Sequence, residues 1–213
     1  AKRHARGEHA GSDWLEVLAV SSSIQAIVNN VRQEAKVAHQ KDNLSFTAVR
    51  VSDMLQEVHG NFIYKLEKKS ISWNVDMEDA DAIVWVDRSI FVMNVISNIV
   101  SNSIKFTDND GSGAIFITVK SLGQRSSDRV ELTFKDNGIG IPLLLQKKIY
   151  DGGKETSRRG TDNEPGTGFG MGMIRDYIQL NGGTIHLSST CRDDGDLTSG
   201  TTIVIVLPKG NVA

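Results

Sequence analysis

The spacing of apolar residues predicts a chain in which helices and strands are interleaved. Over residues 14–40, apolar positions recur mostly every three or four residues, which predicts a long helix whose apolar stripe needs a second helix or a second copy of the chain. After a short strand near 44–51, the same spacing predicts a helix over 52–68, with Ser52 as its cap, and an almost wholly apolar helix over 88–105.

The remaining elements are mostly strands. They are expected at 71–75, 82–86, 114–120, 129–134, 184–188 and 201–207, with one more helix at 171–180. Several of these strands are joined by short turns, which favours a mixed sheet with helices on one face over a doubly wound parallel sheet. The predicted fold class is therefore α+β, preceded by a long N-terminal helix.

The composition is ordinary for a globular protein. The chain has 213 residues, 39% of them hydrophobic, and its net charge of −2 gives no broad basic surface for a nucleic-acid partner. No apolar run approaches the roughly 20 residues that span a bilayer, so no membrane contact is expected within this chain. No signal peptide is visible at its start. The single cysteine, Cys191, excludes an internal disulfide framework and fits a reducing compartment.

A line of polar residues follows one face of the third predicted helix. Asn94, Asn98, either Ser101 or Asn102, and Lys105 fall there at helical spacing. A buried carboxamide without a partner costs about 1–3 kcal/mol, so each needs one. For Asn94, a role in a structural amide network or at a solvated edge explains the residue at least as well as ligand binding does. For Asn102 and Lys105 we favour a ligand, because a carboxamide oxygen suits Mg²⁺ and an ammonium group suits phosphate.

Two glycine-rich runs stand at the ends of regular elements. Asp136 ends a strand and is followed by Gly138 and Gly140, which let the backbone approach a flat ligand closely. A carboxylate would repel phosphates, so its natural partner is a donor such as the exocyclic amine of adenine. The second run, residues 166–172, leads into a helix, where free N–H groups favour phosphate. Either run alone would also suit a simple turn.

Two other nucleotide motifs do not fit. The chain has no Gly-x-x-x-x-Gly-Lys-Ser/Thr and therefore no P-loop. Neither glycine run matches the Gly-x-Gly-x-x-Gly of dinucleotide folds, since positions 171 and 173 are both methionine.

Taken in this order, the motifs resemble those of the catalytic ATP-binding domain of sensor histidine kinases, in the GHKL superfamily. The likeness is strong over about 44–209 and weaker over 12–43, which resembles the second helix of the dimerisation and histidine-phosphotransfer hairpin. The matching segments are 98–106 for the N box, 136–140 and 166–172 for the two glycine boxes, and 181–185 and 200–208 for the closing strands.

The resemblance divides the chain into three parts and implies a fold. Residues 1–11 are expected to be a disordered or appended end, 12–43 a partial hairpin helix, and 44–213 the catalytic ATP-binding domain. The implied fold is the Bergerat fold, a two-layer sandwich of a mixed sheet and helices. ATP would lie between the N-box helix and a lid over 142–165, a stretch too long and irregular for an ordinary connection.

The resemblance also assigns roles. Asn102 binds Mg²⁺ with Asn98 assisting, Lys105 reaches phosphate, Phe106 flanks the nucleotide and Asp136 reads the adenine amine; Asn98, Asn102 and Lys105 are the implied catalytic residues. The other implied nucleotide-binding residues are Gly138, Gly140, Ile141, Gly166, Thr167, Gly168, Phe169, Gly170, Met171, Gly172 and Thr201. Three cations of the lid are candidates for the γ-phosphate, although solvated loop charge is the commoner role for any one of them: Lys154, Arg158 and Arg159.

Asn98 bears on the reaction type. Hydrolytic members of the superfamily and the dehydrogenase kinases resemble one another in having a glutamate base four residues before the metal-binding Asn. A carboxamide at that position cannot accept a proton, so water activation should be poor. An imidazole can attack with its free lone pair, which favours transfer to histidine.

The implied function is that of a protein-histidine kinase domain of a two-component system. With Mg²⁺ as cofactor, it would transfer the ATP γ-phosphoryl group to a hairpin histidine, for relay to an aspartate on a response regulator receiver domain. Neither His4 nor His9 lies in the family's acceptor pattern, so the acceptor is not evident and the chain is expected to be incomplete alone. The other implied partners are the acceptor helix of the same protein and a second copy in a full-length homodimer. The implied location is the cytoplasm, including the cytoplasmic part of a membrane-bound sensor.

The sequence leaves two alternative functions open. A degenerate, non-catalytic ATP-sensing GHKL module would share the same motifs and regulate a partner. A structural dimerisation domain would explain the first helix, but it leaves the amide stripe and both glycine runs without a reason.

Overall fold

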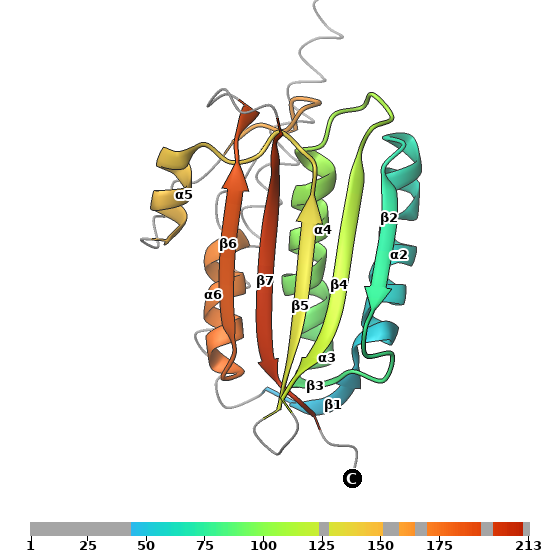
Figure 1. The fold of residues 1–213 in the computed structure, drawn as a ribbon, viewed down its shortest axis with the longest axis vertical. Helices are drawn as coiled ribbons and strands as arrows, with labels where there is room; N and C mark the ends of the chain where they lie inside the picture. Colours follow the sequence, from blue (N-terminus) through green and yellow to red (C-terminus); the bar gives the residue numbers. More distant parts are fainter. Residues whose placement is uncertain (1–43, 124–127, 151–157, 165–169, 193–197, 211–213) are drawn as a thin grey trace, which may run out of the picture. The chain divides into compact units, whose positions relative to one another are not determined.

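The described part of the chain contains an open sheet and the helices that cover one of its faces (Figure 1). The computed structural model describes residues 44–123, 128–150, 158–164, 170–192 and 198–210, so the helix predicted over 14–40 lies outside the described residues. In chain order, the elements are β1 (Thr47–Arg50), α2 (Val51–Lys68), β2 (Ser72–Met77), β3 (Ile83–Val86), α3 (Arg88–Ile90), the π-helix η2 (Phe91–Ile96), α4 (Ser97–Lys105), β4 (Ala114–Leu122), β5 (Arg129–Asp136), α5 (Leu143–Tyr150), α6 (Gly170–Leu180), β6 (Thr184–Thr190) and β7 (Gly200–Pro208).

The main sheet is mixed, as the sequence predicts. Its five strands run in the order β2-β4-β5-β7-β6, with β2 parallel to β4 and every other neighbouring pair antiparallel. A separate antiparallel pair joins β1 to β3. Figure 1 shows α2, α4 and α6 together behind the main sheet.

Alternation along the strands fixes which face the helices cover. On β5, Val130, Leu132 and Phe134 are buried, whereas Glu131 and Thr133 between them are partly exposed. Each large apolar side chain buried in this way contributes about 1.5–3 kcal/mol. The period of two therefore predicts both the strand and its covered face.

The helix predicted over 88–105 is present, with one feature that the sequence did not indicate. Asp87 caps its start by accepting from the amide of Ile90 at 3.1 Å. The middle of the helix, η2, is a π-helix, in which the amide of Ser97 donates to the carbonyl of Val92 five residues earlier. The wider turn shifts the angular positions of the side chains that follow it.

Two local expectations need correction. Ser52 does not cap α2, which begins at Val51 after Arg50 and has no side-chain cap. The amide of Val51 instead donates to the backbone carbonyl of Ala82 at 3.0 Å, so a neighbouring segment satisfies the start of the helix. Part of the stretch expected to be an irregular lid, Leu143–Tyr150, forms the helix α5 directly after Pro142.

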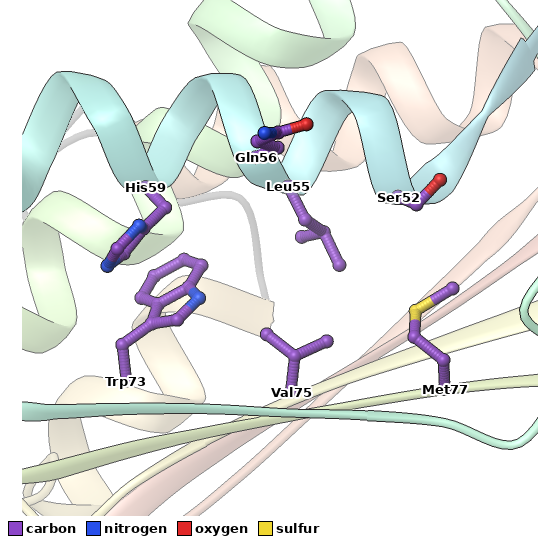
Figure 2. Close-up of a pocket in the computed structure, with 7 residues that line it drawn as sticks. All are labelled: Ser52, Leu55, Gln56, His59, Trp73, Val75 and Met77. Carbon is purple, nitrogen blue, oxygen red and sulfur yellow. The ribbon is translucent and has the colours of Figure 1, made fainter.

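A groove of about 210 Å³ lies between α2 and the edge strand β2 (Figure 2). His59 and Trp73 face one another across it, with their ring centroids 5.3 Å apart. None of the predicted site residues lines this groove; its lining consists of Ser52, Leu55, Gln56, His59, Trp73, Val75 and Met77. Within the described ranges, every helix is too short or too polar to cross a membrane.

Candidate functional site

Asp136, the last residue of β5, lies in a closed hydrogen-bond cage. Only 8% of the residue is exposed, and its Oδ1 accepts from the amides of Gly138 and Thr201, both at 3.1 Å. Its Oδ2 accepts from the hydroxyl of Ser103 at 2.9 Å. A carboxylate offers about four acceptor positions, so one remains, on Oδ2. Burial raises the pKa of Asp136 above its ordinary range, although the bonds from Ser103, Gly138 and Thr201 oppose that rise.

The glycines after Asp136 permit contacts that a side chain would prevent. A Cβ on Gly138 would lie 2.5 Å from the carbonyl oxygen of Phe106, at the end of α4. Gly140 has a φ of 71°, in the left-handed region, and a Cβ there would overlap the backbone carbonyl of Thr190. The first glycine run is therefore pressed against both the end of α4 and the end of β6.

Ser103 joins this cage to the amide stripe, because it directly follows Asn102 on α4. Asn102 is half-buried, and within the described part of the chain its carboxamide makes no hydrogen bond. One turn earlier, the Nδ2 of Asn98 donates to the backbone carbonyl of Asn94 at 2.6 Å. The bond between Ser103 and Asp136 thus holds the end of β5 against α4 at the residue next to Asn102.

Sequence reasoning did not single out Ser103. The available signal was a small polar residue on the apolar side of a helix, where an unpaired hydroxyl would be costly. Its own carbonyl accepts from the hydroxyl of Thr107 at 2.7 Å, so both residues are satisfied inside the protein.

The second glycine run reaches the same helix. Gly170 begins α6, and a Cβ placed on it would lie 3.9 Å from the Cγ of Asn98. A Cβ on Gly172 would meet no atom of the described residues within 4 Å, and Met171 packs against the core. Four residues implied for this site lie outside the described residues: Gly166, Thr167, Gly168 and Phe169.

Two cations lie around the ring of Phe106. The Nζ of Lys105 is 5.1 Å from the ring centroid, and the Cζ of Arg158 is 6.0 Å from it. Lys105 donates to the carbonyl of Arg158 at 3.3 Å, and Arg158 donates to the carbonyl of Gly140 at 2.7 Å. Burial lowers the pKa of Lys105, while the charge of Glu164 acts in the opposite direction. This corner of the site is positively charged and suits an anionic ligand.

Thr201 and Ile141 lie at the β6–β7 side of the cage. The hydroxyls of Thr201 and Ser189 are 3.0 Å apart, and Ser189 also accepts from the amide of Ile141 at 2.8 Å. In the sheet register, Thr201 stands directly opposite Asp136. The closing strand therefore supplies both a backbone donor and a hydroxyl beside the carboxylate.

The arrangement can be compared with known proteins. The family model described as histidine kinase-, DNA gyrase B-, and HSP90-like ATPase matches residues 87–211, which is more than half of the 213-residue chain. The chain belongs to this family. The match runs from the cap of the Asn-bearing helix through the last strand and includes every residue of the site described above.

Among individual relatives, sensor kinases recur. The chain is 29% identical over 161 residues to the sensor histidine kinase TmoS of Ectopseudomonas mendocina, covering 76% of this chain and 16% of TmoS. It is 28% identical over 163 residues to the adaptive-response sensory kinase SasA of Synechocystis sp., covering 76% of this chain and 40% of SasA. The chain thus spans less than half the length of these relatives.

Solved structures agree with the fold. The catalytic domain of the histidine kinase ThkA, in a nucleotide-free form, matches with a TM-score of 0.60 and 26% identity over 78% of this chain and 97% of that domain. ThkA in complex with the response regulator protein TrrA matches with a TM-score of 0.64 and 22% identity, over 98% of this chain and 53% of ThkA, which shows the fold alone. The predicted α+β fold of the Bergerat type is confirmed.

Proposed function

We propose that this chain is the ATP-binding catalytic domain of a two-component sensor histidine kinase. The observation that carries the proposal is the Ser103–Asp136 hydrogen bond of 2.9 Å, because it places the buried carboxylate beside the Asn-bearing helix. A buried acceptor, a half-buried carboxamide and a cationic corner then surround one ligand site. The family membership and the sensor-kinase relatives support the same activity.

The adenine ring would bind at Asp136. One acceptor position remains on this carboxylate, and an exocyclic amine supplies the matching N–H. Thr201 lies beside it, and the close packing of Gly138 and Gly140 against the ends of α4 and β6 fixes the backbone that follows the carboxylate. Phe106 would flank the nucleotide.

Mg²⁺ would bind at Asn102. Its half-buried carboxamide has no hydrogen-bond partner among the described residues, and a neutral oxygen ligand suits this ion when phosphate oxygens supply most of the others. Mg²⁺ bound there would neutralise charge on the phosphates. Asn98 would assist from the preceding turn, while Lys105 and Arg158 would contribute positive charge.

The reaction would be transfer to an imidazole. The bond between the γ-phosphorus and the β–γ bridging oxygen breaks and ADP leaves with that electron pair, while a phosphorus–nitrogen bond forms and the imidazole N–H proton passes to solvent. Asn98 cannot act as a base, so attack by water gains no comparable help. The site therefore favours phosphohistidine formation over hydrolysis.

The partners follow from this activity. The acceptor would lie on the dimerisation hairpin of the same protein, in a full-length homodimer in the cytoplasm. The phosphoryl group would then pass to a response regulator, the kind of partner that ThkA has in its complex with TrrA.

The direct test mixes this chain with the first helix of the hairpin and γ-labelled ATP. We expect acid-labile, base-stable label on a histidine. Good ATP binding without label would favour the ATP-sensing module, and fast release of free phosphate would favour a hydrolase.

A further inference from the structure

A buried ammonium group lies at the C-terminal end of α4, next to Lys105 and Phe106 of the proposed nucleotide site. Lys69 follows α2 directly, and only 5% of the residue is exposed. A lysine is almost never buried to this extent unless its charge is paired and all its donors are used.

The donors of Lys69 go first to the end of α4. Its Nζ donates to the carbonyls of Ile104 at 3.2 Å and Thr107 at 3.3 Å. These carbonyls belong to the last turn of the helix and the residues just beyond it, where backbone acceptors lack partners within the helix. A positive charge at this end also complements the helix dipole.

The remaining contacts of Lys69 go to the segment 158–164. Its Nζ donates to the hydroxyl of Thr161 at 3.0 Å and lies 3.2 Å from Asp162 Oδ2 and 3.4 Å from Glu164 Oε1. The segment forms a tight turn in which the amide of Asn163 donates to the carbonyl of Gly160 at 3.0 Å. One ammonium group therefore joins three parts of the chain.

The same segment carries Arg158 into the nucleotide site. Thr161 donates through its amide to the carbonyl of Lys105 at 3.0 Å, and through its hydroxyl to that of Thr107 at 2.8 Å. Three residues earlier, Arg158 lies over Phe106 and bonds to Gly140. The place of Arg158 thus depends on how the turn is held against α4.

We propose that Lys69 is a positioning residue for nucleotide binding, which fixes the 158–164 turn to the end of α4 and so holds Arg158 at the phosphate-binding corner. The inference rests on the proposed nucleotide site. It adds a residue that does not line this site but holds one of its side chains in place. Lys69 touches no ligand itself; it acts through Arg158.

A double-mutant cycle separates this role from a simple contribution to folding. Lys69→Met should weaken ADP binding about tenfold, because small misplacements of a positioned group are costly. In an Arg158→Met background, the same change should lower ADP affinity by less than about twofold, because the side chain that Lys69 positions is already absent. The control is Lys68→Met, which removes the same charge from an exposed neighbour on α2 and should leave affinity unchanged.

Amide hydrogen exchange gives a readout that needs no nucleotide. Lys69→Met should speed exchange at Thr161 and Asn163 by at least about tenfold, while the strand amides of β5 keep their protection. Thr161→Val keeps the side-chain shape, removes only the hydroxyl, and should reproduce both effects in weaker form. Thr161→Val therefore tests the same role if Lys69→Met does not fold.

The outcomes are distinct. Wild-type affinity in a folded Lys69→Met protein, or equal losses with and without Arg158, would overturn the positioning role while leaving the proposed function in place. A wild-type chain that binds no nucleotide would contradict the proposed function, and exchange at 161 and 163 would then decide whether Lys69 holds the turn.

Discussion

The two ends of the proposed site differ in how far the protein satisfies its own polar groups. Asp136 already accepts three hydrogen bonds from within the chain, at 2.9–3.1 Å. Asn102, whose neighbour Ser103 supplies one of those bonds, has no hydrogen bond to its own carboxamide among the described residues. The polar groups around Asp136 are thus arranged before any ligand binds, whereas we propose that a metal and phosphates complete the Asn102 end.

This difference predicts how each end should respond to change. A prebuilt end loses both binding and local order when its central group is altered, because its donors are left unpaired. An end completed by the ligand loses function with little effect on the free protein. Substitutions at each end, and a change of pH, test that contrast.

The largest effect is expected from Asn102→Ala. Phosphoryl transfer to the hairpin histidine should fall by at least about 1,000-fold, because the proposed metal site loses its protein ligand. Affinity for ADP without Mg²⁺ and the unfolding midpoint should change little. Asn94→Ala, on the same stripe, is the control and should keep most of the activity. Single-turnover experiments measure transfer, and calorimetry measures the metal-free affinity and the unfolding midpoint; an equal loss of metal-free affinity would contradict the contrast.

Asp136→Asn should weaken nucleotide binding by about 100-fold, which corresponds to about 2.7 kcal/mol. An amide has one acceptor oxygen in place of two, so it cannot serve Ser103, Gly138, Thr201 and the adenine amine together. Wild-type protein should also prefer ATP to inosine triphosphate, which lacks the amine, and the variant should lose that preference. Competition binding with the two nucleotides checks this, and a preference retained by the variant would place the base elsewhere.

Gly140→Ala should destabilise the folded protein by at least about 2 kcal/mol, because its φ of 71° is strained for alanine and its Cβ would overlap the carbonyl of Thr190. Gly60→Ala is the matched control. It lies within α2 with nothing inside 4 Å of its Cβ, so it should stabilise by roughly 0.5–1 kcal/mol. Urea unfolding distinguishes the two, and similar midpoints would mean that the Asp136 end is not fixed by its backbone.

The smallest effect concerns pH. Burial raises the pKa of Asp136 in the folded protein, so between its ordinary and raised values the folded state holds a proton that the unfolded state has lost. The desolvation cost of the carboxylate is fully present above the raised pKa and fades as the pH falls through it. The stability of wild type relative to Asp136→Asn should therefore increase on acidification, by about 1.4 kcal/mol for every pH unit that separates the folded pKa from the unfolded pKa.

Denaturant titrations of both proteins over a pH series test this sign. ATP affinity should fall over the same window, because a protonated carboxyl offers fewer acceptor positions. The raised pKa would be contradicted if the stability difference between the two proteins did not change with pH. It would also be contradicted if Asp136→Asn became the more stable of the two, relative to wild type, on acidification.

The sequence was enough to find the residues that alternate or recur. The faces of β5 and α4 follow from periodicity, and Asp136 and Asn102 stand where those elements carry polar groups that burial makes costly. The Bergerat fold itself came from the order of the motifs, and the structure neighbours confirm it. The roles of Asn102 and Asp136 remain predictions.

What the sequence did not reveal depends on partners far away along the chain. Lys69 resembles any other lysine at a helix end, and one of its hydrogen-bond partners, Thr161, lies 92 positions later. The cap expected at Ser52 was wrong because a backbone carbonyl of Ala82 meets the first amide of α2.

The most direct test of the central claim is a crystal structure of this chain with Mg²⁺ and a non-hydrolysable ATP analogue. The account predicts one nucleotide whose adenine amine donates to Asp136 and whose metal, about 2.1 Å from its ligands, is bound by the carboxamide oxygen of Asn102. A nucleotide that meets only one of these two side chains, or that binds away from both, would contradict it.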